Sequence, residues 1–222
     1  MTERRFRDRT PAEGVRRRSS PGGKASGDRP GQWRTFVAVP LPSETLGALR
    51  ALSDKMPRVA RDSVRWIDAD GIHLTLRFLG GIEPDRVPQI SESLLGAAAQ
   101  SGRFALRLGG LGAFPSLDRP RVFWVGLDGE LDRLKRLHAR VEGALSRVGV
   151  EPEARDFEPH LTVGRMRNGI AQHLARRAGY AFARAKLPMP ALEFTVASIT
   201  LFRSHLSDTG ARYEALSEAP LG

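Results

Sequence analysis

The sequence predicts an α+β fold in which helices alternate with mainly antiparallel strands. Amphipathic helical and strand segments alternate along the chain, but several neighbouring strands are joined by connections short enough for hairpins. The tripeptide His-Leu-Thr occurs twice, at 73–75 and 160–162, and each half of the chain combines one copy with a long helix and several strands. We therefore expect a bilobal pseudo-twofold duplication, with two mainly antiparallel sheets flanked by helices and a central cleft.

Strand segments are identified by alternation of apolar and polar side chains or by short apolar runs bounded by turn residues. They lie at 33–40, 64–67, 71–80, 103–108, 121–127, 157–165, 192–202 and 213–216. Strand 33–40 is apolar on both faces, which favours a central position in a sheet. The glycine-rich run 109–115 is expected to be a flexible bend, because it has neither the ending of a P-loop nor the spacing of a dinucleotide site.

Helices are predicted where apolar residues recur every three or four positions. The first begins near Ser43, the second at Pro84, and a weaker one covers 170–182. The strongest covers 130–148, and one of its faces carries Leu131, Leu134, Leu137, Val141 and Leu145.

Residues 1–31 differ from the rest of the chain. They contain nine basic and four acidic residues, many glycines and prolines, and almost no large apolar side chains. Such a segment cannot bury enough surface to offset its ordering entropy, so we expect a disordered basic tail. The folded domain is then expected to be residues 32–222, and we expect it to be a monomer.

Composition narrows the function classes. The chain has no cysteine, which excludes disulfides, thiolate nucleophiles and cysteine-ligated zinc. No apolar run is long enough to span a membrane, and no apolar segment follows the basic N-terminus as in a signal peptide. These features favour a cytoplasmic protein without a membrane partner. The net charge of +10 favours polyanions such as RNA as partners.

The two tripeptides carry the candidate chemistry. Strand alternation places His73 and Thr75 on one face of their strand, and His160 and Thr162 on one face of theirs. A histidine has an unperturbed pKa of about 6.5, so one of the pair can accept a proton while the other donates one. Two such residues and two hydroxyl donors suit a phosphodiester substrate, with no metal or other cofactor required.

Two arginines are candidate phosphate ligands. Arg77 has the same parity as His73 and Thr75 along its strand, so alternation places it on the motif face. Arg165 lies three residues after Thr162 and, by strict alternation, on the opposite face, so a phosphate role would require a bulge or the end of the strand.

Three other functions are compatible with parts of this pattern. Two histidines could bind zinc, although neither motif offers an evident third ligand. A serine hydrolase would require a nucleophile elbow, and the chain contains no Gly-x-Ser-x-Gly. A non-catalytic RNA-binding module could use the charge and the cleft without turnover. Replacement of either histidine would abolish the activity of an enzyme, whereas a binding module has no turnover to lose.

With these motifs in hand, the chain resembles the 2H phosphoesterase superfamily. Within it, the RNA 2′,3′-cyclic phosphodiesterases, historically called 2′-5′ RNA ligases, are the most similar. The resemblance covers about 34–216 and includes the extended first motif His-Leu-Thr-Leu-Arg-Phe-Leu-Gly. Further matching segments are 34–39, 110–115, 120–126 and 201–206, with Gly210 and Tyr213.

The resemblance implies a function and a division of roles. It implies hydrolysis of a terminal 2′,3′-cyclic phosphate on RNA to a 2′-phosphate without metal, with 2′-5′ ligation as the reverse reaction. It assigns the general acid to His73, the general base to His160, and phosphate binding to Thr75 and Thr162. Val163-Gly164 departs from the Leu-Ala that is common in the family, which we expect to be harmless.

Overall fold

The structure is a computed structural model that describes residues 31–187, 192–207 and 210–222. The expected tail, 1–31, lies outside the described residues except for Gly31. The α-helices are α1 (Ser43–Asp54), α2 (Arg58–Ser63), α3 (Val87–Ala99), α4 (Leu131–Arg147) and α5 (Gln172–Ala183), with 3-10 turns η1 (Ala69–Gly71) and η2 (Pro84–Arg86). The strands are β1 (Trp33–Val39), β2 (Val64–Trp66), β3 (Leu74–Ile82), β4 (Phe104–Phe114), β5 (Val122–Gly129), β6 (His160–Met166), β7 (Glu193–Val196), β8 (Ser198–Ser207) and β9 (Gly210–Pro220).

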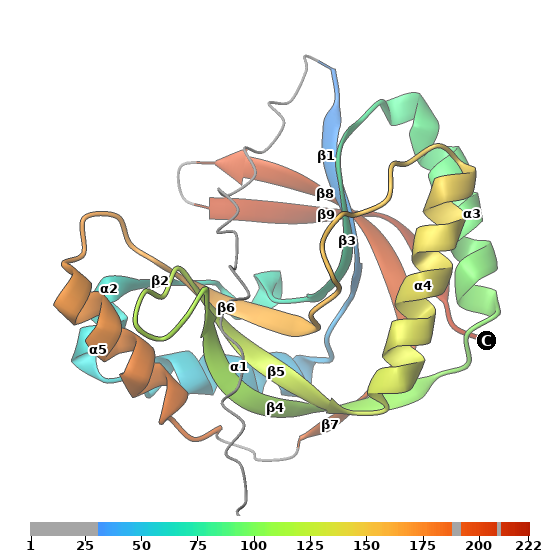
Figure 1. Cartoon of the computed structure of the whole chain (residues 1–222). Helices are drawn as coiled ribbons and strands as arrows, with labels where there is room; N and C mark the ends of the chain where they lie inside the picture. Colours follow the sequence, from blue (N-terminus) through green and yellow to red (C-terminus); the bar gives the residue numbers. More distant parts are fainter. Residues whose placement is uncertain (1–30, 188–191, 208–209) are drawn as a thin grey trace, which may run out of the picture.

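All nine strands belong to one curled sheet, and every pairing in it is antiparallel (Figure 1). Its order is β7-β4-β5-β6-β3-β1-β8-β9, and β2 pairs with β6 beside this path. The mixed helix and strand class is therefore confirmed, but the expected separation into two sheets is wrong for the described strands. We call strands β7-β4-β5-β6 and strands β3-β1-β8-β9 the two flanks of the sheet. The two flanks are joined because β3 and β6 pair at Leu74 and Leu161.

Helices cover the two flanks in pairs. Helices α3 and α4 pack against each other, with α4 on β3 and α3 on β8 and β9; in Figure 1 they stand together on the right. Helices α2 and α5 pack together, and α5 contacts β4. The apolar stripe of α4 accounts for its position, because Leu134, Leu137 and Val141 are fully buried. Burying such a side chain contributes about 1.5–3 kcal/mol.

The glycine-rich run 109–115 is not the flexible bend that its composition predicts. It continues β4 to Phe114, with a register shift between Leu108 and Leu111. A glycine is needed at position 112 because a Cβ there would lie 2.2 Å from the ring of Trp124 on β5. The glycine therefore makes room for an indole rather than for backbone motion.

Candidate functional site: two histidine motifs on one face of the sheet

The centre of the sheet brings the two motifs together. Strands β3 and β6 are antiparallel and pair at Leu74 and Leu161, both fully buried. In this register, the positions on either side of that pair place each motif histidine opposite the threonine of the other motif. Side chains directly opposite in an antiparallel pair share a face and lie about 4.5–5.5 Å apart at Cβ. The sheet face away from Leu74 and Leu161, here called the motif face, thus carries His73, Thr75, His160 and Thr162.

The two imidazole rings are held in the same way. Nδ1 of His73 lies 3.0 Å from the carbonyl oxygen of Gly71, and Nδ1 of His160 lies 2.7 Å from that of Glu158. A carbonyl oxygen only accepts hydrogen bonds, so each Nδ1 carries a proton and donates it. This leaves Nε2 of each ring for proton exchange with a substrate. The two carbonyls were not found by sequence reasoning, because backbone partners leave no side-chain signature.

His73 lies in an aromatic environment. Its ring stacks on Phe36 at 4.6 Å between centroids, meets Tyr213 edge-on at 5.0 Å, and lies 6.2 Å from Phe202. Burial lowers the pKa of His73 from its ordinary value to about 4, and the hydrogen bond to Gly71 partly opposes this shift. His73 is therefore neutral at neutral pH and can accept a proton at Nε2.

His160 has a single ring neighbour among the described residues: Phe114, met edge-on at 5.0 Å. It is partly exposed, as is Thr162 two residues later. The aromatic residues around both histidines belong to segments that the sequence linked to the site only through the family resemblance.

A β-bulge removes Arg77 from the motif face. Ala38 of β1 pairs with Thr75 and Val37 pairs with Arg77, so Leu76 is the extra residue in β3. A bulge of one residue reverses the alternation that follows it. The parity that predicted Arg77 on the motif face is therefore wrong, and Arg77 is buried with only 6% of its side chain exposed.

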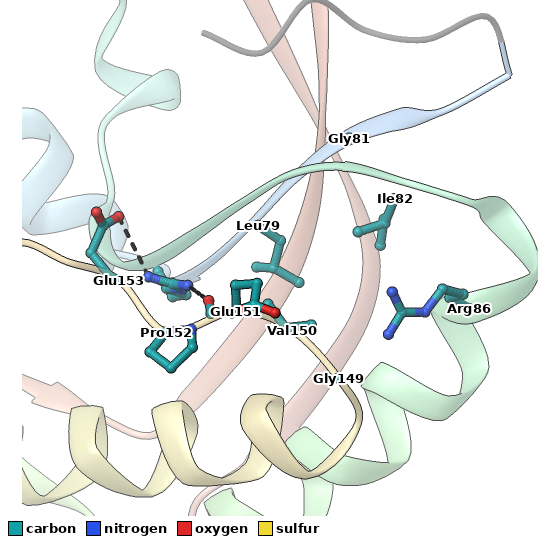
Figure 2. A pocket seen from close by; sticks show the side chains of 10 residues that line it. Leu79, Gly81, Ile82, Arg86, Gly149, Val150, Glu151, Pro152 and Glu153 are labelled. Carbon is teal, nitrogen blue, oxygen red and sulfur yellow. Dashed lines mark hydrogen bonds and ion pairs between the residues drawn. The ribbon is translucent and has the colours of Figure 1, made fainter. Parts of the chain in front are cut away.

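The guanidinium of Arg77 links strand β3 to helix α4 and to the segment 151–153, on the side of the sheet away from the motif face. It forms ion pairs with Glu142 of α4 (Nε–Oε1 3.3 Å) and Glu153 (Nη1–Oε2 3.5 Å), contacts that lack hydrogen-bond geometry. Its Nη2 donates a hydrogen bond to the carbonyl oxygen of Glu151. Arg77, Glu151 and Glu153 are among the residues that line a pocket of about 320 Å³, which no motif histidine or threonine lines. Figure 2 shows this pocket with Glu151 and Glu153 labelled. Arg77 thus holds the segment before β6 and does not face the motif residues.

Another bulge brings Arg165 to the motif face. Trp124 of β5 pairs with Thr162 and Phe123 pairs with Gly164, so Val163 is the extra residue in β6. After this reversal Arg165 has the orientation of Thr162, and its side chain is exposed. Its charge also acts on the hydroxyl of Tyr213: burial raises the pKa of that phenol, and the positive charge of Arg165 opposes the rise. Of the two arginines, Arg165 is therefore the one that lies on the motif face.

The described residues contain no group of three or more histidine, aspartate or glutamate side chains that could hold a metal ion. None of the helices in the described ranges is long and apolar enough to cross a membrane.

Comparison with protein families identifies the superfamily. A model described as the 2′-5′ RNA ligase superfamily matches residues 37–208. The chain belongs to this superfamily. The match covers both motif strands and confirms the resemblance found from the motifs.

Curated relatives in the superfamily carry one name. A protein of Aeropyrum pernix named RNA 2′,3′-cyclic phosphodiesterase is 34% identical over 173 residues, which are 78% of this chain and 94% of the relative. A protein of Geobacillus stearothermophilus with the same name is 33% identical over 189 residues, 84% of this chain. The chain spans only 56% of the length of the Geobacillus relative.

Solved structures of similar fold include a Thermus thermophilus protein, with a TM-score of 0.70 and 27% identity over 85% of this chain and 97% of that one. Escherichia coli LigT, solved in complex with 3′-AMP, has a TM-score of 0.67 and 25% identity over 86% of this chain and 98% of LigT. The similarity of fold therefore covers both flanks of the sheet.

Proposed function

We propose that this protein is an RNA 2′,3′-cyclic phosphodiesterase that hydrolyses a terminal 2′,3′-cyclic phosphate to a 2′-phosphate. The observation that carries the proposal is the pairing of Leu74 with Leu161, because that register sets both motif histidines and both motif threonines around one point of the motif face. The names of the curated relatives support the same activity.

The proposed reaction uses the four motif side chains and Arg165. One histidine takes a proton at Nε2 from a water molecule, whose oxygen forms a bond to phosphorus. The bond from phosphorus to the 3′ oxygen breaks, and the other histidine gives that oxygen a proton. The hydroxyls of Thr75 and Thr162 donate hydrogen bonds to the non-bridging oxygens, and the charge of Arg165 stabilises the added negative charge. Ligation reverses these proton transfers.

The environments of the histidines favour His73 as the general base in hydrolysis. A base must be neutral before the reaction, and burial among aromatic rings keeps His73 neutral at pH 7. His160, with a single aromatic neighbour, is then the general acid. The family resemblance assigns the opposite roles, and a substrate whose leaving group needs no proton separates the two assignments.

The acidic limb of the pH profile should lie at unusually low pH. kcat/KM reports the pKa values of the free enzyme. If His73 is the base, kcat/KM should stay high through pH 6 and fall only as the pH approaches 4, where His73 becomes protonated. Activity should be measured with a cyclic nucleotide, while circular dichroism checks that the protein remains folded. A loss of kcat/KM on acidification that is centred near pH 6.5 would contradict the lowered pKa of His73.

A substrate with sulfur at the 3′ bridging position tests the acid directly. A thiolate leaves without a proton, so the variant that lacks the general acid should regain its rate on this substrate. We expect recovery with His160→Ala and not with His73→Ala. Recovery with His73→Ala alone would restore the roles that the resemblance implies.

We also infer that the domain is a bilobal pseudo-twofold duplication around a central cleft. Outward from the central pair, β6-β5-β4-β7 corresponds to β3-β1-β8-β9. Each motif strand has its bulge one residue after the motif threonine, at Leu76 and at Val163. Phe202 of β8 and Phe114 of β4 are also equivalent, because each contacts the motif histidine of its own flank.

The activity should survive removal of metal ions. Purified protein is incubated, with EDTA present, with a short RNA that ends in a 2′,3′-cyclic phosphate, and the position of the product phosphate is identified. We expect full turnover to a 2′-phosphate, because the two histidines supply both proton transfers. Loss of turnover with EDTA and its return with a divalent ion would contradict the mechanism. Adding an RNA with a 5′ hydroxyl to a parallel sample measures ligation.

A further inference from the structure

The stretch 165–186 carries charge of one sign only. It contains six lysine or arginine residues and no aspartate or glutamate. Helix α4, by contrast, has Asp132 and Glu142 among its basic residues. Acidic side chains stabilise the first turn of a helix, yet the first turn of α5 has none. Charged helix faces are common and by themselves imply no partner, so the arrangement of these charges decides whether they form a site.

The charges of α5 line a groove. Helices α2 and α5 pack against each other and lie together on the left of Figure 1. Because α5 buries Ala178 and Phe182, its opposite face points outward. A groove of about 860 Å³ follows this outer face, and none of its lining residues in the described ranges is acidic. Five of the lining residues are basic or aromatic: His173, Arg176, Arg177, Tyr180 and Arg184.

The three arginines of the groove are available to a ligand. Arg176 forms an ion pair with Asp118 (Nε–Oδ1 3.2 Å), but both side chains are more than half exposed. Such a surface pair adds little stability, so a phosphate can replace the carboxylate. Among the described residues, no carboxylate forms an ion pair with Arg177 or Arg184. The ring of Tyr180, 5.8 Å from the guanidinium of Arg176, adds an aromatic surface between the cations.

Basic residues connect the groove to the motif face. Phe114, beside His160, ends β4, and the loop that follows it reaches α5, where Gln172 donates a hydrogen bond to the carbonyl oxygen of Asp118. Four exposed arginines lie at this end of β5 and β6: Arg119, Arg121, Arg165 and Arg167. The seven residues from His160 to Arg167 correspond to about 23 Å of strand. A mononucleotide at the motif face is therefore too short to reach the groove, whereas a longer strand can.

Resting on the proposed function, we propose that the groove of α2 and α5 binds the phosphate backbone of the RNA strand that precedes the terminal nucleotide. The three groove arginines contact phosphates, and Tyr180 stacks on a base. Cationic grooves with interleaved aromatic rings bind single strands in this way, with little dependence on sequence. The groove should therefore favour long RNA over short substrates without selecting a sequence.

Two variants with equal loss of charge test the proposal. The groove variant replaces the three groove arginines: Arg176→Gln, Arg177→Gln and Arg184→Gln. The control variant replaces three exposed basic residues of α4: Lys135→Gln, Arg136→Gln and Arg147→Gln. Glutamine has nearly the helix propensity of lysine and arginine, so both variants should remain folded.

The first measurement compares a long and a short substrate. The long one is an RNA of about 15 nucleotides, enough to fill a single-strand site, that ends in a 2′,3′-cyclic phosphate. The short one is adenosine 2′,3′-cyclic phosphate. At about 0.1 M salt the groove variant should raise KM for the RNA by about 10- to 100-fold, because it loses three phosphate contacts. Both variants should match the wild type on the short substrate.

The second measurement is independent of catalysis. A fluorescent RNA of the same sequence that ends in a 3′ hydroxyl is not a substrate, and its anisotropy gives Kd over a series of salt concentrations. Each phosphate contact to a single strand contributes about 0.7 to the slope of log Kd against log salt concentration. The slope should therefore be smaller by about 2 in the groove variant and unchanged in the control variant.

The outcomes separate the groove from the proposed activity. An unchanged KM for the RNA and an unchanged salt slope in the groove variant would overturn the groove proposal and leave the phosphodiesterase intact. Equal losses in both variants would overturn it as well, because they would reflect net charge alone. A loss on adenosine 2′,3′-cyclic phosphate in the groove variant would also count against it. No turnover by the wild type would overturn the proposed function, while the salt slope would still decide about the groove.

Discussion

His73→Ala and His160→Ala should each lower kcat by about 10²–10⁴-fold, the contribution of a positioned general acid or base. The double variant should be far less than multiplicatively worse, because two groups that serve one proton relay fail together. His173→Ala, at an exposed histidine of α5, is the matched control and should keep full activity. The measurement is single-turnover hydrolysis of a cyclic nucleotide at pH 7.

The fold should survive these substitutions. Leu74 and Leu161 fill the core beside the motif side chains, and the motif residues themselves are only partly buried. Thr75→Ala and Thr162→Ala should cost less than the histidine variants, about 1.5–3 kcal/mol each, the value of a hydrogen bond to a charged group. Near-wild-type turnover in a folded histidine variant would contradict the shared site. Unfolding of both histidine variants would show instead that the histidines are structural.

Arg77→Met should destabilise the protein by about 3–5 kcal/mol, because removing one partner leaves a charge largely buried and unpaired. The side chain of Glu142 is only 20% exposed and loses its ion pair with Arg77, which leaves only the contact with His138 at 3.8 Å. The double variant Arg77→Met with Glu142→Gln should recover part of this loss. Arg136→Met, on the exposed face of α4, should change the stability by no more than about 0.5 kcal/mol. Urea unfolding followed by circular dichroism gives these free energies. Wild-type stability in Arg77→Met would contradict the role of Arg77 as a buried clamp.

The fold class and the two motifs could be predicted because they depend on local patterns. Period-two alternation identified β3 and β6, and the repeated tripeptide linked them. The expectation of two sheets failed because the flanks join through the pairing of Leu74 with Leu161, a contact that no local pattern encodes.

The orientation of the arginines could not be predicted for a similar reason. The bulge at Leu76 has no neighbouring glycine or proline that would indicate a break in alternation. The bulge at Val163 is followed directly by Gly164, a glycine within a strand that can mark a bulge but does not by itself fix its position. Arg77 can be buried because Glu142 and Glu153, more than 60 residues later in the chain, neutralise it. Only the tertiary structure brings these charges together, so parity alone assigned Arg77 and Arg165 to the wrong faces.

The order of strands in the sheet has a consequence for how the protein is made. In one flank, strands β4, β5 and β6 come from the continuous stretch 104–166 and only the edge strand β7 comes later, whereas the other flank pairs β1 with β8 across more than 150 residues. Loop closure of that length is slow, so we expect the continuous flank to form first during synthesis. The rings of Phe202 and Tyr213 that surround His73 arrive with the last strands. A nascent chain should therefore hold His160 in place well before His73 acquires its lowered pKa, and catalysis should begin only after the ribosome has released the C-terminal strands.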